Sequence, residues 1–161
     1  MQTLSTLLSP QHITLDLEVS SKKRLFEQAG LLFENLNALP RVRVYDSLFA
    51  RERLGSTGMG HGIAIPHGRI SGLRLAAGAL MRLRTPIAFE APDGAPVSLA
   101  FVLMMPERAT SMHLAILSQL AELLSDPPVR DRILTAPDAA TIHHLFSTWQ
   151  PHVTHQRSAT R

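Results

Sequence analysis

Apolar side chains recur along the chain at spacings that predict helices alternating with strands. The first helix is expected to begin at a cap formed by Ser20 or Ser21 and to end near Asn37, shortly before Pro40. One face of this helix carries apolar residues three or four positions apart: Leu25, Phe26, Ala29, Leu32, Phe33 and Leu36. We therefore predict that this face is buried.

The middle of the chain changes from helical to strand-like spacing. A second, shorter helix is predicted through about Arg53, because apolar residues repeat at helical intervals before it: Val44, Tyr45, Leu48 and Phe49. Residues 55–62 contain four glycines and are predicted to form a loop rather than a regular element. Residues 63–65 are a short apolar run that Pro66 stops, and residues 73–83 and 97–104 are apolar runs of strand length.

The last third of the chain returns to helical spacing. Ser111 is predicted to cap an amphipathic helix, which the sequence Asp126-Pro-Pro ends. Residues 129–134 and 139–149 predict two further helices, with Pro137 between them. Helices that alternate with strands are typical of the α/β class, so we predict a single domain with a mixed β-sheet flanked by α-helices.

The composition adds limits to this picture. The chain has 161 residues, 45% of them hydrophobic and 18% charged, which suffices for one domain with a core. It contains no cysteine, which excludes disulfides, thiolate metal sites and cysteine nucleophiles. No apolar run is long enough to cross a bilayer, so no membrane insertion is expected. The first residues have neither a basic start nor a small-residue cleavage site, so we expect no secretion signal and a cytoplasmic protein.

Positive charge is concentrated in the middle of the chain. The net charge is +3, yet residues 41–84 hold eight arginines against Asp46 and Glu52, a local balance of +6. A basic segment of this kind attracts anions such as phosphate, anionic substrates or nucleic acid. Only eight aromatic residues are present, and no nucleic-acid-binding motif or basic helix stripe is found, so no nucleic-acid partner is expected.

One histidine stands in an unusual local context. Glycine-rich loops allow backbone N–H groups to approach an anion, but the glycines of residues 55–62 are not followed by Lys-Ser/Thr and do not match the dinucleotide fingerprint. His67 comes after them, between Pro66 and Gly68. Proline fixes the backbone before the histidine and glycine leaves space after it. An imidazole, a good nucleophile when neutral, is therefore predicted to lie in an open site.

Two residues far from His67 in the sequence are candidates to support it. His113 lies at the start of the amphipathic helix, where an apolar residue would be expected, and Arg51 precedes the glycine loop. The sequence has no paired-carboxylate motif, no GxSxG and no HExxH. An arginine can neutralise phosphoryl oxygens and a second imidazole can donate a hydrogen bond to one. We therefore expect a phosphoryl-transfer protein rather than an enzyme that turns over a small molecule, with no cofactor and no metal.

The stretch RERLGSTGMGHGIAIPHGR, residues 51–69, resembles the phosphorylation-site signature of the fructose/mannitol-type enzyme IIA domains of the phosphoenolpyruvate phosphotransferase system. LSPQHITL at residues 8–15 and HLAILSQLA at residues 113–121 extend the likeness, which is strongest to the nitrogen-regulatory branch. The resemblance covers about residues 5–148. Residues 149–161 are predicted to form a polar, mobile tail.

The resemblance implies a mixed sheet flanked by helices and a histidine that a phosphocarrier of the HPr type phosphorylates. Matched motif to motif, His67 is the acceptor, and His113 and Arg51 are its supports. The implied partners are an HPr-like donor and regulatory target proteins, with nitrogen- or potassium-linked processes as the regulated functions. His61 stands where the resemblance predicts a small polar residue, often Asn. If it faces the site, its protonated ring is expected to stabilise a phosphoryl group on His67.

Several interpretations remain open at this point. The chain is either a regulatory phosphocarrier or the IIA component that relays phosphate to a sugar-specific IIB in fructose/mannitol-type transport. We favour the first, and a binding module with an inactive site is disfavoured because His67, His113 and Arg51 are all present. His61 and His67 could form a metal pair, but no carboxylate is placed to complete it. Glu52 is interpreted either as a partner of an arginine or as an ordinary solvated acid.

Overall fold

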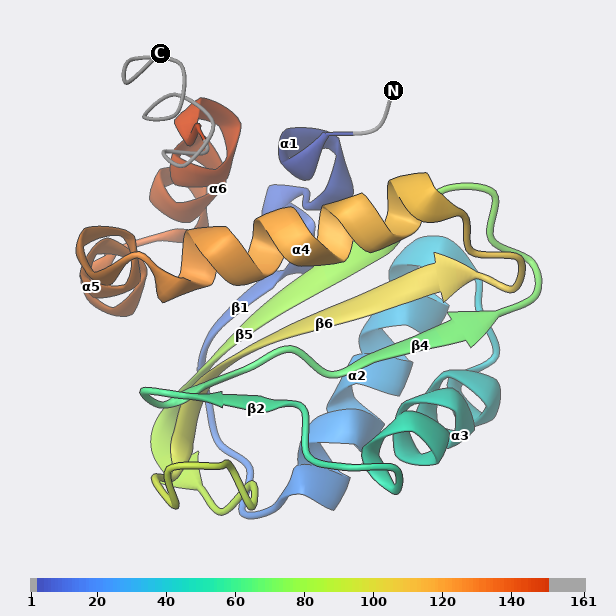
Figure 1. The fold of residues 1–161 in the computed structure, drawn as a ribbon, viewed down its shortest axis with the longest axis horizontal. Coiled ribbons are helices and arrows are strands. Elements are labelled where there is room, and N and C mark those ends of the chain that lie inside the picture. Colours follow the sequence, from blue (N-terminus) through green and yellow to red (C-terminus); the bar gives the residue numbers. More distant parts are fainter. Residues whose placement is uncertain (1–2, 151–161) are drawn as a thin grey trace, which may run out of the picture.

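A six-stranded β-sheet lies between two groups of helices in the computed structural model, which describes residues 3–150 (Figure 1). The strands are β1 (Ile13–Leu17), β2 (Gly58–Gly60), β3 (Ile63–Ala64), β4 (His67–Ile70), β5 (Ala77–Ile87) and β6 (Val97–Pro106). The helices are α1 (Leu4–Leu7), α2 (Lys22–Asn37), α3 (Arg41–Glu52), α4 (Ser111–Ser125), α5 (Pro127–Thr135) and α6 (Ala139–Thr148), with a short 3-10 turn at Pro10–His12. The predicted mixed sheet flanked by helices is thus confirmed.

The sheet is mixed because its strands pair in both directions. Their order is β1-β5-β6-β3-β2, and β4 also pairs with β6, beyond the end of β3. β1 runs parallel to β5, β5 antiparallel to β6, and both β3 and β4 parallel to β6. β1 carries an irregularity between Thr14 and Leu17, where Asp16 adopts a left-handed φ of 55°.

Alternate residues of the central strand β6 supply two separate cores. Leu99, Phe101 and Leu103 pack with α1, α4, α5 and α6 on one face of the sheet. Ala100, Val102 and Met104 pack with α2 and α3 on the other face. A strand buried on both faces reads as a continuous apolar run, which explains why residues 97–104 show no polar alternation.

Most predicted helices are confirmed. Ser21 caps α2, its hydroxyl accepting a hydrogen bond from the N–H of Arg24. The cap of α4 is Thr110 rather than Ser111, which is the first helical residue. No helix within residues 3–150 is long and apolar enough to cross a membrane. The tail predicted from residue 149 lies, from residue 151 onward, outside the described residues.

The strands depart further from the sequence prediction. The interpretation of residues 55–62 as a loop is wrong in part, because Gly58–Gly60 forms β2 and pairs antiparallel with β3. The strand predicted at residues 73–83 is displaced to Ala77–Ile87, since residues 71–76 form the turn after β4. β1, β4 and α1 were not predicted. Each is short, and the pairing that stabilises β1 and β4 comes from strands distant in the sequence.

Helix α3 approaches strand β4 more closely than a side chain at residue 68 would allow. A Cβ added to Gly68 would lie 2.1 Å from Oγ of Ser47 and 3.1 Å from its Cβ. The Ser47 hydroxyl donates a hydrogen bond of 2.8 Å to the carbonyl of Arg69. The absence of a side chain at residue 68 therefore lets α3 lie directly against the strand that begins with His67.

We expect Gly68→Ala to destabilise the fold by about 1–3 kcal/mol, the usual range for overpacking a tight contact. Most of the clash is with Ser47 Oγ, so the same substitution should cost less in a Ser47→Ala background. Chemical denaturation of the two single variants and the double variant measures both effects. Additive losses of stability would show that the hydroxyl is not the obstacle.

Candidate functional site

A surface groove of about 500 Å³ lies where α3, β4, the end of β6 and α4 converge. His67 begins β4 and Arg51 lies in the last turn of α3, and both line the groove. The remaining lining residues are Ser47, Ala50, Leu54, Gly68, Arg69, Met105, Leu114 and Leu117. The structure therefore brings together two of the three residues selected from the sequence.

His67 is positioned by a break in a strand. Ile63 faces Leu99 and His67 faces Leu103 on β6, so β3 and β4 follow β6 in the same register. Pro66 lies between them and has no N–H to donate, although its carbonyl accepts a hydrogen bond from Leu103 N–H at 2.9 Å. The neighbouring residue in β4, Gly68, faces α3, so strand alternation directs the His67 side chain to the opposite face, towards α4.

The imidazole of His67 is held by its own backbone. Nδ1 lies 2.8 Å from the carbonyl oxygen of Ile65, two residues earlier. A carbonyl oxygen only accepts hydrogen bonds, so in the neutral ring Nδ1 carries the proton and Nε2 keeps its lone pair. Partial burial is the main cause that lowers the pKa of His67, and the positive charge of Arg51 lowers it further. The Ile65 carbonyl and the negative charge of Glu52 act in the opposite direction, but the pKa remains below its ordinary value.

Arg51 lies beside His67 without an acidic partner within ion-pair distance among the described residues. Its Nη1 donates a hydrogen bond of 2.8 Å to the carbonyl of Gly55, at the start of the glycine segment. This contact holds the guanidinium at the groove, where its remaining donors are available to an anion. The alternative in which Glu52 pairs with Arg51 is not found in the part of the chain that the structure describes.

His113 is the third candidate, and the structure does not place it among the residues that line the groove. It is buried in the first turn of α4, directly before Leu114, which does line the groove. Its Nδ1 accepts a hydrogen bond of 2.9 Å from the backbone N–H of Thr110, as the acceptor of a capping box does. The proton of the neutral ring is therefore on Nε2, a buried atom without a hydrogen-bond partner among the described residues.

His61 lies in the turn between β2 and β3 rather than in the groove. It is exposed, its φ is 58°, and its backbone N–H donates to Oδ2 of Asp93 at 2.9 Å. The charged groups that act on His67 are Arg51 and Glu52, so the expected influence of His61 on the site is not supported. Asn tolerates the left-handed conformation better than most residues, which explains why the resemblance predicts it at this turn.

The acid next to Arg51 has partners that the sequence did not reveal. Glu52 is 8% exposed and receives two hydrogen bonds from Thr57, from the hydroxyl at 2.6 Å and from the backbone N–H at 3.1 Å. The ammonium of Lys22 lies 3.0 Å from Oε2 of Glu52 and 3.1 Å from Oε1 of Glu90. Glu52 is thus neither a solvated acid nor an arginine partner. Lys22 is 30 positions away in the sequence, and no local pattern marks it.

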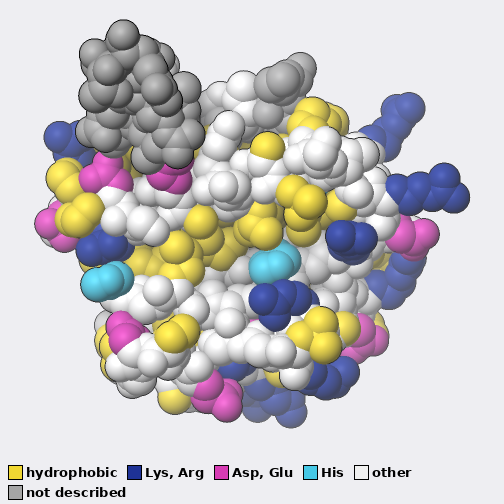
Figure 2. Space-filling model, in the orientation of Figure 1, with side chains coloured by type: hydrophobic (Ala, Val, Ile, Leu, Met, Phe, Trp, Pro, Cys, Tyr) yellow, Lys and Arg dark blue, Asp and Glu magenta, His cyan; other side chains and the backbone are white. Residues whose placement is uncertain are grey.

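The rim of the groove is apolar. Leu54 is 84% exposed and Leu114 is 56% exposed, although both are large hydrophobic residues. Figure 2 shows apolar side chains gathered in a band across this face, with histidine and basic side chains along its lower border. A half-buried imidazole bordered by exposed apolar groups suits a site that another macromolecule covers.

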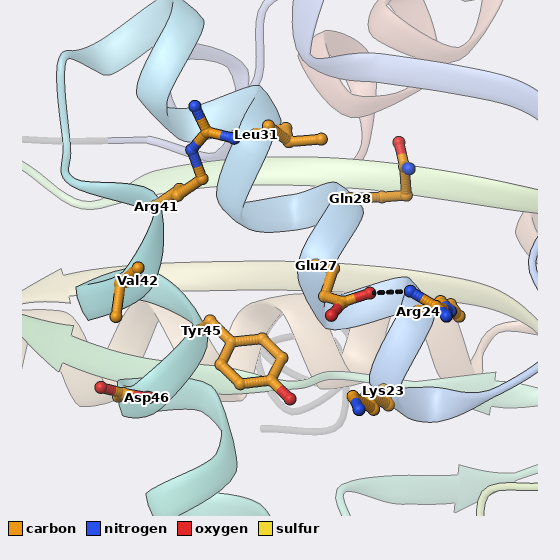
Figure 3. A pocket seen from close by; sticks show the side chains of 9 residues that line it. All are labelled: Lys23, Arg24, Glu27, Gln28, Leu31, Arg41, Val42, Tyr45 and Asp46. Atoms are coloured by element: carbon orange, nitrogen blue, oxygen red, sulfur yellow. Dashed lines mark hydrogen bonds and ion pairs between the residues drawn. The ribbon is translucent and has the colours of Figure 1, made fainter.

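A second groove, between α2 and α3, has different chemistry. The side chain of Tyr45 projects from α3 towards α2, and Arg24 is paired with Glu27 at 2.8 Å (Figure 3). Arg41, which also lines this groove, is paired with Glu34 at 3.0 Å. Its lining contains no histidine, so the His67 groove is the candidate for nucleophilic chemistry.

Comparison with known proteins identifies the class to which this fold and site belong. The sequence matches the family described as "Phosphoenolpyruvate-dependent sugar phosphotransferase system, EIIA 2" over residues 6–149. The chain therefore belongs to the type 2 enzyme IIA family of this phosphotransferase system. The matched residues include His67, Arg51 and His113 and all the residues that line the groove.

Individual relatives show which members of the family this chain resembles. A nitrogen regulatory protein of Pseudomonas aeruginosa is 43% identical over 146 residues, which cover 90% of this chain and 95% of that protein. The crystal structure of the nitrogen regulatory protein IIA-Ntr from Neisseria meningitidis is 50% identical with a TM-score of 0.85, covering 89% of this chain and 98% of that chain. The fructose-specific EIIABC component of Bacillus subtilis is 31% identical over 145 residues, 89% of this chain but 23% of that protein.

The electrostatic balance at His67 can be tested directly. Arg51→Gln removes a positive charge that disfavours the imidazolium, so the pKa of His67 should rise. NMR titration of the His67 ring protons in the wild type and the variant measures this shift. An unchanged or lower pKa in the folded variant would show that the guanidinium does not act on the ring.

Proposed function

We propose that this chain is a regulatory phosphocarrier in which Nε2 of His67 accepts a phosphoryl group from a histidine-bearing phosphocarrier of the HPr type. The observation that carries the proposal is the hydrogen bond from Nδ1 of His67 to the Ile65 carbonyl, which leaves Nε2 as the nucleophilic nitrogen. The lowered pKa of the ring keeps it neutral near pH 7, so the lone pair is available.

The transfer requires no proton to leave His67. The Nε2 lone pair forms a bond to the phosphorus as the bond between phosphorus and the donor's ring nitrogen breaks, and that bond's electron pair returns to the donor imidazole. His67 keeps its Nδ1 proton throughout, and the Ile65 carbonyl stabilises the positive charge that the ring gains. The protein contributes mainly position and charge, as in other phosphoryl transfers.

Arg51 and His113 are proposed to act on the phosphoryl oxygens. The guanidinium of Arg51 already lies beside His67 and can neutralise their charge. Nε2–H of His113 is a buried donor that has no partner within residues 3–150, and such a donor gains a hydrogen bond when an anionic oxygen arrives. His113 would then serve the site from the turn of α4 that it also caps.

A regulatory role is favoured by the relatives that align along nearly their whole length. The Pseudomonas and Neisseria proteins are named as nitrogen regulatory proteins, and this chain covers 95% and 98% of them. We therefore propose that the phosphorylation state of His67 controls binding to regulatory target proteins in nitrogen- or potassium-linked processes. In such a protein the exposed apolar rim of the groove serves both the phosphate donor and the targets.

The second candidate is the IIA component of a fructose/mannitol-type transporter, which would pass its phosphate to a IIB component. The observation in its favour is the 31% identity to the fructose-specific EIIABC component. Incubation of the phosphorylated protein with a purified IIB domain separates the two roles. Rapid loss of phosphate to IIB supports transport, whereas retention of phosphate together with phosphorylation-dependent binding to target proteins supports regulation.

Phosphorylation should be confined to His67. After incubation with phosphoenolpyruvate, enzyme I and the phosphocarrier, we expect one added phosphoryl group in the intact mass and none in His67→Ala. Mild acid should remove it, because acid keeps the ring protonated on Nδ1, the form in which it is the better leaving group. NMR of the labelled protein should assign the phosphorus to Nε2. Normal labelling of His67→Ala, or a phosphoryl group on another residue, would overturn the proposal.

The capping role of His113 and its chemical role can be tested separately. Gln in the third helical position completes the usual capping box with Thr110, so His113→Gln should fold with near-normal stability. It lacks the imidazole Nε2–H, and we expect the transfer rate to fall roughly 10²-fold, the typical cost of one lost donor to a developing oxyanion. His113→Ala should lose both rate and stability. Rapid-quench kinetics and thermal unfolding measure the two effects, and wild-type rates in His113→Gln would leave His113 with a structural role alone.

A further inference from the structure

A continuous series of polar contacts connects a buried ion pair to the imidazole of His67. It begins at the Lys22 ammonium, 3.0 Å from Oε2 of Glu52. Glu52 then receives the two hydrogen bonds from Thr57, at 2.6 Å and 3.1 Å. The carbonyl of Thr57 accepts the backbone N–H of Ile65 at 3.0 Å. The carbonyl of Ile65, finally, accepts Nδ1–H of His67 at 2.8 Å.

These contacts determine where the Ile65 carbonyl lies. Residues 53–57 connect α3 to β2, and Thr57 is hydrogen-bonded to Glu52 on one side and to Ile65 on the other. Ile65 is the last residue before Pro66, and the hydrogen bond from its N–H to the Thr57 carbonyl helps to orient the backbone that carries its own carbonyl. The side chain of Glu52 is 5% exposed, and a carboxylate so buried is held rigidly when its hydrogen bonds are satisfied.

Lys22 supplies the cation that pairs with the Glu52 carboxylate. Its side chain is 15% exposed and lies 4.6 Å from the centre of the Phe89 ring. It also contacts Glu90, which is 85% exposed and therefore contributes little by itself. Breaking a buried ion pair by removing one partner is costly, because the other group is left without a counter-charge. The groups that face Glu52 are thus Lys22 from α2 and Thr57 from the following loop.

We propose that Glu52, paired with Lys22, is a positioning residue for His67: it fixes Thr57 and Ile65 so that the ring holds its proton on Nδ1 and presents Nε2 to the groove. It acts through the backbone and does not touch the phosphoryl group. The inference rests on the proposed function only for its kinetic consequence, since the state of the ring is a property of the unphosphorylated protein. Orienting a catalytic histidine in one tautomer is an established task for a carboxylate, here carried out over two residues rather than by direct contact.

The chain provides a matched control for Glu52. Glu34 makes the same two kinds of contact at the other end of α3, accepting the backbone N–H of Arg41 at 3.1 Å and its Nε at 3.0 Å. The N-terminal end of α3, with Arg41, is drawn in Figure 3. Arg41 and Glu52 are the first and last residues of α3, which places them roughly 16 Å apart along the helix. Loss of either carboxylate loosens α3, but only Glu52 connects to His67.

The test is ¹⁵N NMR of the His67 ring in the unphosphorylated wild type, Glu52→Gln and Glu34→Gln. In the wild type, Nδ1 should be protonated and Nε2 unprotonated. In Glu52→Gln the two nitrogen shifts should move towards each other as the tautomers mix, and the pKa of His67 should fall because a nearby negative charge is lost. Glu34→Gln should leave both quantities at their wild-type values. Thr57→Val removes only the 2.6 Å hydrogen bond to Glu52 and should move the two nitrogen shifts in the same direction by a smaller amount. This variant replaces Glu52→Gln in the test if Glu52→Gln does not fold.

Transfer kinetics provide the second measurement. We expect phosphorylation of Glu52→Gln to slow roughly tenfold, which corresponds to about the free energy of one hydrogen bond to a charged group. Glu34→Gln should be phosphorylated at the wild-type rate. Wild-type ring shifts in folded Glu52→Gln or Thr57→Val would overturn the proposal, as would equal changes in Glu34→Gln. The nitrogen shifts of the His67 ring are measured in the unphosphorylated protein. They therefore test the positioning role of Glu52 even if His67 cannot be phosphorylated.

Discussion

The break between β3 and β4 is the constraint on which the site depends. Both strands follow β6 in one register, with Pro66 between them. The carbonyl of Ile65, directly before this break, accepts the ring proton of His67. A backbone contact thereby determines which ring nitrogen of His67 carries the proton and which keeps its lone pair.

The two-faced core explains how one groove can draw on distant parts of the chain. β6 is covered on one face by α4 and on the other by α3, and β4 extends along its outer edge. At that edge the two helix layers meet without a further strand between them. Residues from α3, β4 and α4 therefore converge there, although they are separated by more than 60 positions in the sequence. The close contact of α3 with Gly68 brings Arg51 near enough to act on the His67 ring.

The sequence allowed the class, the long helices and the position of His67 in an open groove to be predicted, because each depends on local features. Periodic apolar residues define α2 and α4, and the Pro66-His67-Gly68 setting is visible in three consecutive letters. Short elements such as β1 and β4 could not be predicted, since their stability comes from partners elsewhere in the chain. The role of Glu52 was missed for the same reason. Its cation comes from α2, and the hydrogen bonds that bury it exist only after the loop at Thr57 has folded.

The outer strands of the sheet affect how this protein can meet others. At one edge, β1 has five residues and is interrupted by the left-handed Asp16, and at the other edge β2 and β4 have three and four residues. Short and irregular edge strands offer no continuous row of free N–H and C=O groups to a second chain. Recognition by β-augmentation, in which a partner adds a strand to the sheet, is therefore unfavourable for the described fold. Partners have to select this protein through side-chain shape and chemistry, which a change of charge at a single residue can alter at once.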